Sequence, residues 1–150
     1  MPNQRQYILL VEDSPDDADL TIRAFSRHRF ANKVLHVTNG HQALDFLFGR
    51  DDYSSRGDAP LPSVVLLDLN LPRLHGLDVL KAIRAAERTR NLPVVVLTSS
   101  NDRRDIVECY ESGANSYVRK SIDYNEFSNA IRELVNYWLT LNVLPVASQF

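Results

Sequence analysis

Cysteine is almost absent from this 150-residue chain, and neither sign of charge dominates it. The single cysteine, Cys109, excludes a disulfide framework within one chain and a cysteine-rich zinc site. A formal net charge of -2 indicates no basic surface for nucleic acid. Long apolar runs are also missing, and the residues before Tyr7 are polar, so neither a membrane span nor a signal peptide is predicted. We therefore expect a cytoplasmic protein that binds neither nucleic acid nor membrane.

Short apolar runs alternate with longer amphipathic stretches along the chain. The runs predict five strands, at 7–11, 34–38, 64–67, 93–97 and 116–119. The other stretches predict five helices: one opened by Ser14 and Pro15, one from Gly40, one through 77–83, one over 102–111 and one over 123–141. Strict alternation is typical of parallel strands joined by right-handed crossovers, with helices on both faces. The sequence therefore predicts an α/β fold.

No internal repeat and no linker divides the sequence. We expect a single domain over residues 1–150, with a core at about 6–141 and a C-terminal tail at 142–150. The segment 49–62 is rich in Asp, Ser, Gly and Pro, which predicts a loop that is long for an α/β domain. Because fewer than ten residues follow the last predicted helix, we expect no attached output domain.

Charged and hydroxyl side chains stand at the carboxyl ends of four predicted strands. Glu12 and Asp13 follow the first strand, and Asp68 follows the third. Thr98 ends the fourth strand, and Lys120 ends the fifth. In parallel sheets these ends meet at one edge, where ligands bind. Three carboxylates at one edge repel one another, and a divalent cation that prefers oxygen ligands, such as Mg²⁺, removes that repulsion.

A carboxylate at such an edge can act as the nucleophile toward phosphorus and form an aspartyl phosphate. We assign that role to Asp68. Lys120 and Thr98 would contact the oxygens of the transferred group. Four groups would hold the metal: the carboxylates of Asp13 and Asp68, Glu12 through a water, and the backbone carbonyl of Asn70.

Four segments resemble the signature segments of response-regulator receiver domains. They are Leu10-Val11-Glu12-Asp13, Leu67-Asp68-Leu69-Asn70-Leu71-Pro72, Val96-Leu97-Thr98-Ser99 and Gly113-Ala114-Asn115-Ser116-Tyr117-Val118-Arg119-Lys120. Their order and spacing match the family over roughly residues 6–140. The resemblance implies a doubly wound, flavodoxin-like sheet of five parallel strands in the order 2-1-3-4-5. It also implies a histidine kinase as phosphoryl donor and Mg²⁺ as cofactor, for which Mn²⁺ or Ca²⁺ can substitute.

Three further features are similar to the single-domain response regulators that partner phytochromes, notably the cyanobacterial ones. They are the long loop before the third strand, Ser121 directly after Lys120, and the ending over 137–145. This resemblance implies a phytochrome-type kinase as donor and a homodimer formed through the last helix and the tail. Most receivers have proline in place of Ser121, usually in a cis bond, so the geometry of the Lys120–Ser121 peptide stays open.

The resemblance also assigns Thr98 and Tyr117 as a switch pair. When the threonine hydroxyl turns toward phosphate, the tyrosine ring moves inward and alters the face of the fourth helix, fifth strand and fifth helix. Apolar residues of the last helix, spaced three and four apart, form one stripe, and Val135 and Leu139 widen it. With the apolar tail at 143–146, part of that stripe is expected to form the homodimer interface: Phe127, Ile131, Leu134, Trp138 and Leu141.

Three other functions fit parts of the pattern. A phosphatase of the haloacid-dehalogenase type also uses an aspartate nucleophile, but it needs an acid two residues later, where this chain has Asn70. A binding module that has lost phosphorylation is disfavoured because all the site residues are present. A flavodoxin-like binder of nucleotide or flavin is disfavoured because the turn at 12–15 is acidic and lacks glycine. We therefore expect a phosphoacceptor signalling protein rather than an enzyme.

Overall fold

The computed structural model describes residues 6–30, 33–57 and 59–145. Five strands form one parallel sheet in the order β2-β1-β3-β4-β5, which confirms the predicted fold class and strand order. The strands are β1 (Ile8–Val11), β2 (Val34–Val37), β3 (Val64–Leu67), β4 (Val94–Thr98) and β5 (Ser116–Arg119).

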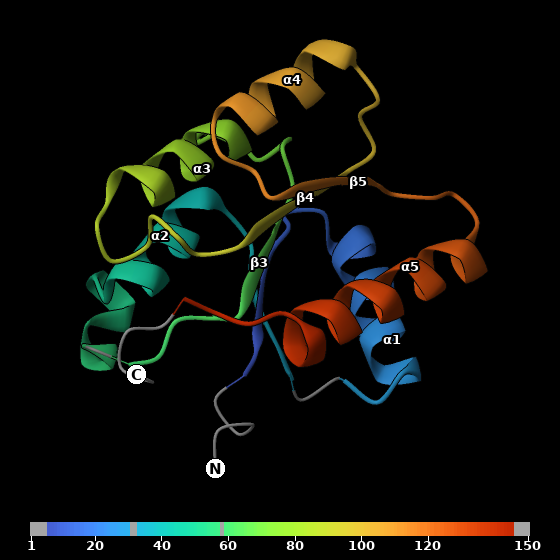
Figure 1. Ribbon diagram of the computed structural model, residues 1–150, viewed down its shortest axis with the longest axis horizontal. Helices are drawn as coiled ribbons and strands as arrows, with labels where there is room; N and C mark the ends of the chain where they lie inside the picture. Colours follow the sequence, from blue (N-terminus) through green and yellow to red (C-terminus); the bar gives the residue numbers. More distant parts are fainter. Residues whose placement is uncertain (1–5, 31–32, 58, 146–150) are drawn as a thin grey trace.

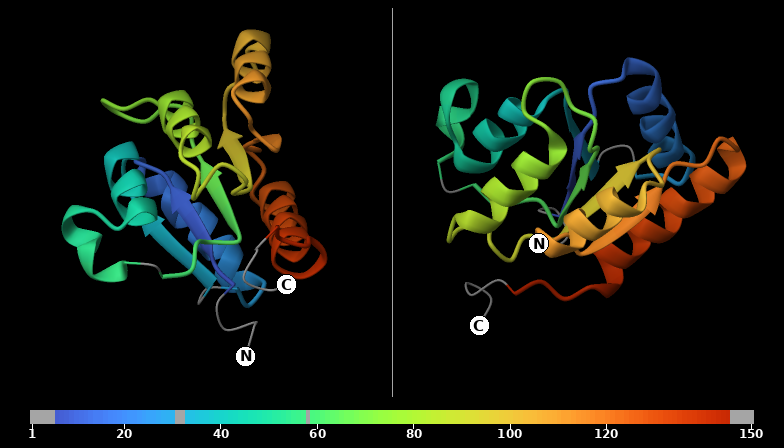
Figure 2. Two further views of the ribbon diagram at one scale, coloured as in Figure 1. Left: turned by 60° about the vertical axis from the view of Figure 1, so that its left-hand side comes forward. Right: turned by 90° about the horizontal axis from the view of Figure 1, so that it is seen from above.

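Helices cover both faces of this sheet (Figure 1). They are α1 (Pro15–Arg27), α2 (Gly40–Phe48), α3 (Gly76–Ala85), α4 (Arg103–Glu111) and α5 (Tyr124–Asn136). Helices α1 and α5 lie on one face, and α2, α3 and α4 lie on the other, an arrangement that both views of Figure 2 support. In β1, Leu9 and Val11 pack toward α2 and α3, while Ile8 and Leu10 pack toward α1 and α5. Burial on both faces explains why the strands are continuous apolar runs.

The helices begin where polar side chains accept backbone N–H groups. Ser14 caps α1, with Pro15 in the first helical position, as predicted. Asp123 caps α5 by accepting from Glu126 N at 3.0 Å. Asp102 caps α4, so the hydroxyl of Thr98 is not used as a helix cap and stays at the end of β4.

The prediction of a loop throughout 49–62 is wrong in its first half. A short 3-10 helix, η3 (Asp51–Arg56), forms there. Tyr53 packs edge-on against Phe46, with ring centroids 5.3 Å apart. The Arg56 guanidinium lies 3.6 Å from the same ring centroid and donates to the Phe46 carbonyl oxygen at 3.0 Å. These contacts are tertiary, so the composition of the segment alone did not predict them.

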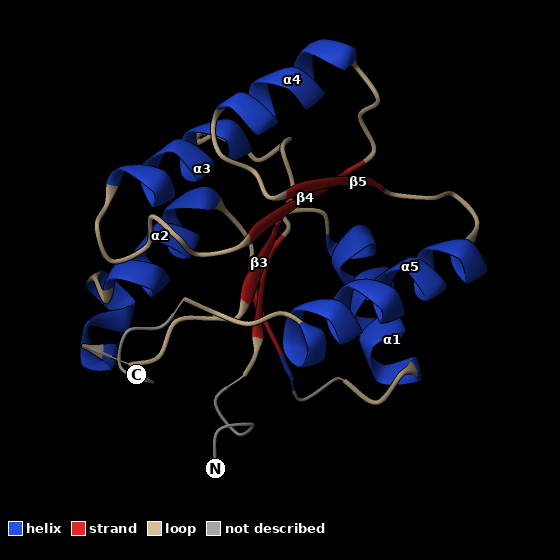
Figure 3. Ribbon diagram, in the orientation of Figure 1, coloured by secondary structure: helices blue, strands red, loops and turns tan. Residues whose placement is uncertain are grey.

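The last helix ends differently from the prediction. Helix α5 stops at Asn136, and a π-helical turn, η4 (Tyr137–Leu141), continues it before the chain becomes a loop (Figure 3). Phe127 and Ile131 lie in the core, with exposed fractions of 6% and 0%. Their assignment to a dimer interface is therefore wrong, because this side of α5 packs on the sheet and α1. Val135 and Leu139 are buried in the same core and do not widen the surface.

The Lys120–Ser121 peptide, which the sequence left open, is trans, as are all peptide bonds within the described residues. None of the helices formed by residues 6–30, 33–57 and 59–145 combines the length and the apolar character that crossing a membrane requires.

Candidate functional site

Backbone hydrogen bonds continue past the strands and bring their ends together. The amide of Asp68 donates to the carbonyl oxygen of Val11 at 3.1 Å, which joins the turns after β1 and β3. The amide of Lys120 donates to the carbonyl oxygen of Thr98 at 2.8 Å, which joins the turns after β4 and β5. The polar residues predicted from separate strand ends therefore lie along one edge of the sheet.

Three carboxylates form an acidic cluster at this edge: Glu12, Asp13 and Asp68. One oxygen atom from each lies within 4.8 Å of the others. Glu12 and Asp68 are buried, with exposed fractions of 2% and 7%, whereas Asp13 is exposed. Burial is the main cause that raises the pKa of Glu12 to about 7, the charge of Asp68 adds to the rise, and Lys120 opposes it. The cluster thus holds negative charge at a cost that a cation would offset.

The backbone below Asp68 is fixed by the start of α3. The amide of Gly76 donates to the carbonyl oxygen of Leu69 at 2.9 Å. A Cβ at Gly76 would lie less than 3.0 Å from the Asp68 carbonyl oxygen, so only glycine allows this approach. Two residues after Asp68, the exposed Asn70 donates its backbone N–H to Asp68 Oδ1 at 3.4 Å. The segment therefore folds back over the carboxylate.

The Lys120 ammonium group lies among carboxylates, with 12% of its side chain exposed. Its Nζ atom is 2.5 Å from Glu12 Oε1 and 3.8 Å from Asp68 Oδ2. A third carboxylate, Asp17 on α1, lies 2.9 Å away through Oδ2. Burial alone would lower the pKa of Lys120, but these hydrogen bonds and charges outweigh it and raise that pKa above its usual value. Lys120 is therefore a fixed positive charge beside Asp68.

Thr98 and Tyr117 meet at one residue, Ser100. The Thr98 side chain is fully buried, and its Oγ1 accepts the Ser100 N–H at 3.4 Å. The Tyr117 hydroxyl donates to the Ser100 carbonyl oxygen at 2.9 Å. Ser100 in turn donates its own hydroxyl to Asp105 in the first turn of α4 at 2.6 Å. The two predicted switch residues are thus joined to each other and to α4 through one peptide segment.

Two residues at this edge were missed by the sequence analysis. Asp17 was not singled out, although it lies in the first turn of α1, directly after the Glu12–Asp13 turn. His36 on β2 donates from Nε2 to the Glu12 carbonyl oxygen at 2.8 Å. The place of Asp17 in the first turn of the helix that follows Glu12 and Asp13 could have indicated it, whereas nothing in the sequence pattern indicated the contact of His36.

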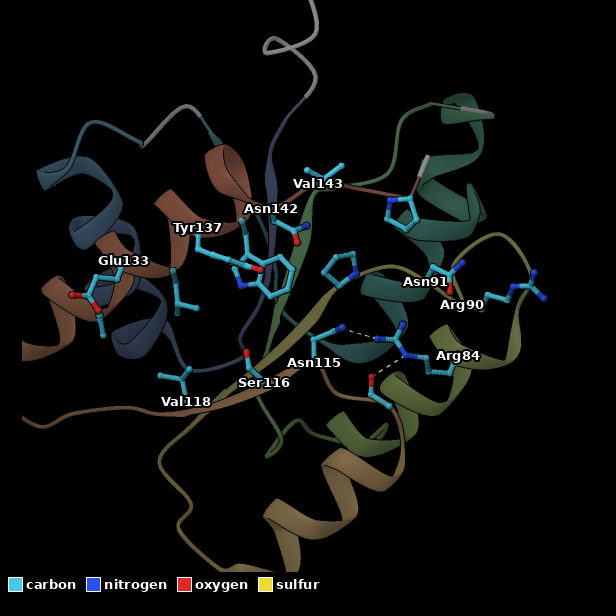
Figure 4. Close-up of a pocket in the computed structure, with 16 residues that line it drawn as sticks. Arg84, Arg90, Asn91, Asn115, Ser116, Val118, Glu133, Tyr137, Asn142 and Val143 are labelled. Carbon is cyan, nitrogen blue, oxygen red and sulfur yellow. Dashed lines mark hydrogen bonds between the residues drawn. The ribbon is translucent and has the colours of Figure 1, made fainter. Parts of the chain in front are cut away.

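A groove lies at the end of the sheet opposite the acidic cluster, between α5, η4 and the residues that precede β4 and β5 (Figure 4). Its volume is about 1050 Å³, and Trp138, Val118 and Val143 contribute apolar surface to it. On its other side, Arg84 donates to neutral oxygens: the Gly113 carbonyl at 2.9 Å, the Leu92 carbonyl at 2.7 Å and the Asn115 side chain at 2.9 Å. This groove contains none of the acidic cluster.

The acidic cluster fits a hard divalent cation. Its donors are carboxylate oxygens close enough to share one ion, and the exposed Asp13 leaves a side of the cluster open to water. Such a donor set suits Mg²⁺ or Mn²⁺, because neither a thiolate nor an imidazole is among its members.

Curated relatives match almost the whole chain. It is 39% identical over 138 residues to the probable methanogenesis regulatory protein FilR2 of Methanothrix harundinacea, covering 92% of this chain and 86% of FilR2. It is 32% identical over 145 residues to the response regulator Rcp1 of Synechocystis, covering 97% of each. Among solved structures, the phosphorylated cyanobacterial phytochrome response regulator RcpA has a TM-score of 0.85 at 31% identity, covering 95% of this chain and 99% of RcpA. RPA3017, a response regulator in red light signaling of R. palustris, has a TM-score of 0.85 at 36% identity and covers 95% of this chain and 99% of its own.

Two similar structures contain a divalent metal. The Mn²⁺-bound form of Rcp1 has a TM-score of 0.82 at 31% identity and covers 94% of this chain and 99% of its own. The receiver domain of the sensor histidine kinase PA1611 from Pseudomonas aeruginosa contains magnesium in its active site cleft. It has a TM-score of 0.65 at 28% identity and covers 89% of this chain and 97% of its own. The family model of the response regulator receiver domain matches residues 8–132. This chain therefore belongs to the response regulator receiver domain family.

Proposed function

We propose that this protein is a single-domain response regulator that accepts a phosphoryl group from a histidine kinase on Asp68, in a Mg²⁺-dependent reaction. One observation carries the proposal. The acidic cluster has three carboxylate oxygens within 4.8 Å of one another, and Lys120 Nζ lies 3.8 Å from Asp68 Oδ2. A nucleophile, ligands for a cation and a positive charge for the phosphoryl oxygens are thereby combined in one site.

In the proposed step, a carboxylate oxygen of Asp68 attacks the phosphorus of a phosphohistidine. The O–P bond forms while the N–P bond breaks, and the bonding electron pair returns to the imidazole nitrogen of the kinase. Lys120 would donate to one phosphoryl oxygen and Thr98 Oγ1 to another, which stabilises the charge that spreads over these oxygens in the transition state. Asn70 stands where a phosphatase would need a general acid, which favours a stored phosphoryl group over repeated turnover of esters.

The residues of the acidic cluster would hold the metal, with Glu12 acting through a water and the backbone carbonyl of Asn70 completing the set. When bound, Mg²⁺ supplies positive charge that neutralises the phosphoryl oxygens. Removal of Mg²⁺ by a chelator should therefore suppress phosphorylation.

The proposed readout runs through Thr98 and Tyr117. If Thr98 Oγ1 turns toward a phosphoryl group on Asp68, it gives up the Ser100 N–H that it now accepts. The Ser100 carbonyl is the acceptor for the Tyr117 hydroxyl, so the same movement would release the tyrosine ring. Because Ser100 also contacts Asp105 of α4, the surface formed by α4, β5 and α5 would change with it.

The proposed donor is a phytochrome-type histidine kinase. The proposal is supported by the likeness to RcpA, a phytochrome response regulator, and to RPA3017, which acts in red light signaling. The reaction would take place in the cytoplasm, because histidine kinases draw their phosphoryl group from ATP. In this proposal residues 1–150 form one receiver domain with a core at about 6–141, the protein binds no nucleic acid, and it is not an enzyme toward other substrates.

We further propose a homodimer formed through η4, the outer side of α5 and the tail at 142–150. Leu134 and Trp138 are only partly buried at the edge of the core, and Leu141 and Val143 have exposed fractions of 63% and 84%. These apolar side chains support an interface. Residues 146–150, which the prediction included in the tail, lie outside the described residues. A single sedimenting species of monomer mass at tens of micromolar, with and without a phosphoryl mimic, would contradict this part of the proposal.

The proposal is tested by transfer of a radiolabelled phosphoryl group from an autophosphorylated phytochrome kinase, illuminated or dark. We expect label on the wild-type protein that depends on Mg²⁺ and is lost in Asp68→Asn. Asp78→Asn is the matched control, because Asp78 is an exposed acid in the first turn of α3 outside the acidic cluster. If Asp68→Asn were labelled as strongly as the wild-type protein, and if acid and base removed the label from both proteins equally, the assignment of Asp68 as phosphoacceptor would be refuted.

A further inference from the structure

Asp17 contacts Lys120 but belongs to neither the acidic cluster nor the proposed phosphoryl contacts. Its Oδ2 atom accepts from Lys120 Nζ at 2.9 Å, across more than a hundred residues of sequence. We propose that Asp17 is a positioning residue, which holds the Lys120 ammonium group in the orientation needed to receive a phosphoryl group on Asp68. This inference rests on the proposed function of Asp68.

The backbone around Asp17 is well placed to hold a side chain still. Asp17 N–H donates to the capping Ser14 Oγ at 3.3 Å, and its carbonyl oxygen accepts from the Thr21 hydroxyl at 2.9 Å. The next residue, Ala18, is buried at 3% exposure and anchors this turn of α1. The Asp17 carboxylate therefore starts from a fixed helical turn, and its short side chain has few rotamers to lose when it binds Lys120.

The number of donors on Lys120 makes the contact specific. An ammonium group has three N–H donors. Glu12 at 2.5 Å and Asp17 at 2.9 Å take two of them, while Asp68 at 3.8 Å is too distant for a direct hydrogen bond. One donor thus remains for a phosphoryl oxygen on Asp68.

Glu12 and Asp17 differ in what else they can bind. Glu12 is part of the acidic cluster, so its hold on Lys120 competes with its role toward a cation. Asp17 is outside that cluster, and 43% of its side chain is exposed. Its hold on Lys120 is therefore independent of the metal, and it can keep the ammonium group in place in both states of the site.

The test compares two substitutions that remove the same charge from the same helical turn. Asp17→Asn weakens the contact with Lys120, whereas Asp16→Asn removes an exposed neighbour that also lies in the first turn of α1. Beryllofluoride serves as the phosphoryl mimic, and its dissociation constant is measured by ¹⁹F NMR at saturating Mg²⁺. We expect the constant to rise about fivefold to thirtyfold in Asp17→Asn and less than about twofold in Asp16→Asn. The first value corresponds to a partial loss, because Asn keeps an acceptor for Lys120 and the contact is partly exposed. Asp17→Glu, which restores the charge, should recover most of the loss.

A second readout follows Lys120 without any ligand. In the wild-type protein and Asp16→Asn, the Lys120 ammonium group should give a ¹H–¹⁵N cross-peak, because its bonds to carboxylates slow exchange with water. In Asp17→Asn this signal should broaden or disappear. A structural role of Asp17 that does not involve Lys120 would leave it unchanged.

The outcomes separate the two proposals. If the wild-type protein fails to bind beryllofluoride, the proposed function is wrong and the role of Asp17 in phosphoryl positioning fails with it, even if the ammonium signal shows that Asp17 holds Lys120. If the wild-type protein binds, while Asp17→Asn binds equally or more tightly, Asp17 does not position Lys120 and this inference is overturned. An unchanged ammonium signal in Asp17→Asn overturns it as well.

Discussion

Lys120 and Arg84 are partly buried cations at opposite ends of the same sheet, and their partners differ in kind. Lys120 lies at the carboxyl ends of the strands among the carboxylates of Glu12, Asp17 and Asp68. Arg84 lies near the amino ends of β4 and β5 and donates to neutral oxygens, two of them the carbonyls of Gly113 and Leu92. Burial lowers the pKa of Arg84, whereas the surrounding carboxylates raise that of Lys120.

The difference in partners indicates a difference in role. Carboxylates can exchange an ammonium group for a metal ion or release it to a phosphoryl group, so Lys120 is suited to a site whose charge changes. Carbonyl groups of loops have no such alternative, and the rigid fork of Arg84 ties the segment before β4 to the turn before β5. We therefore expect Lys120 to control phosphorylation and Arg84 to control stability.

Lys120→Ala should have the largest effect on chemistry. Without the ammonium group, the phosphoryl oxygens lose a positive charge, and the rate of phosphorylation by a small acyl phosphate should fall roughly 100-fold. Arg84→Ala should keep that rate within about threefold, because distant sites act independently. Incorporation of radiolabel at saturating Mg²⁺ measures both. Equal losses in the two variants would remove the distinction between the two ends of the sheet.

Arg84→Ala should have the largest effect on folding. It leaves the carbonyl oxygens of Gly113 and Leu92 without the guanidinium donor, while Asn115 Oδ1 keeps the Val94 N–H. The free energy of unfolding should fall by about 2–4 kcal/mol. Arg84→Lys should restore little of this, because a single ammonium group cannot reproduce the fork. Urea unfolding, followed by circular dichroism, is the measurement. Arg90→Ala, an exposed residue that lines the same groove, is the matched control and should change stability by less than about 0.5 kcal/mol.

Mg²⁺ should sharpen the comparison through its effect on stability. At a hundred times its dissociation constant, a bound ion adds about 2.7 kcal/mol to the free energy of unfolding. We expect this gain in the wild-type protein and in Arg84→Ala, and its loss in Asp13→Asn. Lys120→Ala should bind Mg²⁺ more tightly than the wild-type protein, because the ammonium group no longer occupies Glu12. Calorimetric titration gives the affinities, and weaker binding by Lys120→Ala would show that Lys120 does not compete with the metal.

The smallest expected effect concerns Cys109 of α4, the helix followed by the turn in which Gly113 accepts from Arg84. Burial raises the pKa of this thiol to about 11. At pH 8 the thiol is therefore almost entirely protonated, and alkylation by iodoacetamide should be slow and should speed up about tenfold per pH unit below that pKa. Arg84→Ala should react faster than the wild-type protein, since it loosens the turn that follows α4, while Lys120→Ala should not. Mass spectrometry of quenched samples would detect either result.

The strand ends were predictable from sequence because each polar residue follows directly on a buried apolar run. From that pattern alone, Glu12, Asp68 and Lys120 were predicted to lie at one edge of the sheet. Asp17 was missed because its role depends on a lysine that reaches across from β5, and a helical acid alone indicates only a favourable charge at an N-terminus. The chemical roles of all these residues stay predictions.

For the last helix and the segment 49–62, the local sequence pattern was insufficient, because burial and secondary structure there depend on contacts with residues outside the segment. The stripe on the last helix correctly predicted one apolar side, yet it could not distinguish the core positions of Phe127 and Ile131 from the exposed position of Leu141. The 3-10 helix at 51–56 depends on the ring of Phe46, which lies outside the segment.

The identity of the phosphorylated side chain tests the central claim most directly. After phosphotransfer from the kinase, reduction with borohydride converts an aspartyl phosphate to homoserine, and tandem mass spectrometry locates the converted residue. We predict conversion at Asp68 alone, dependent on Mg²⁺ and absent from the unphosphorylated protein. Conversion at Asp13 or at any acid outside the cluster, with Asp68 unmodified, would contradict the account.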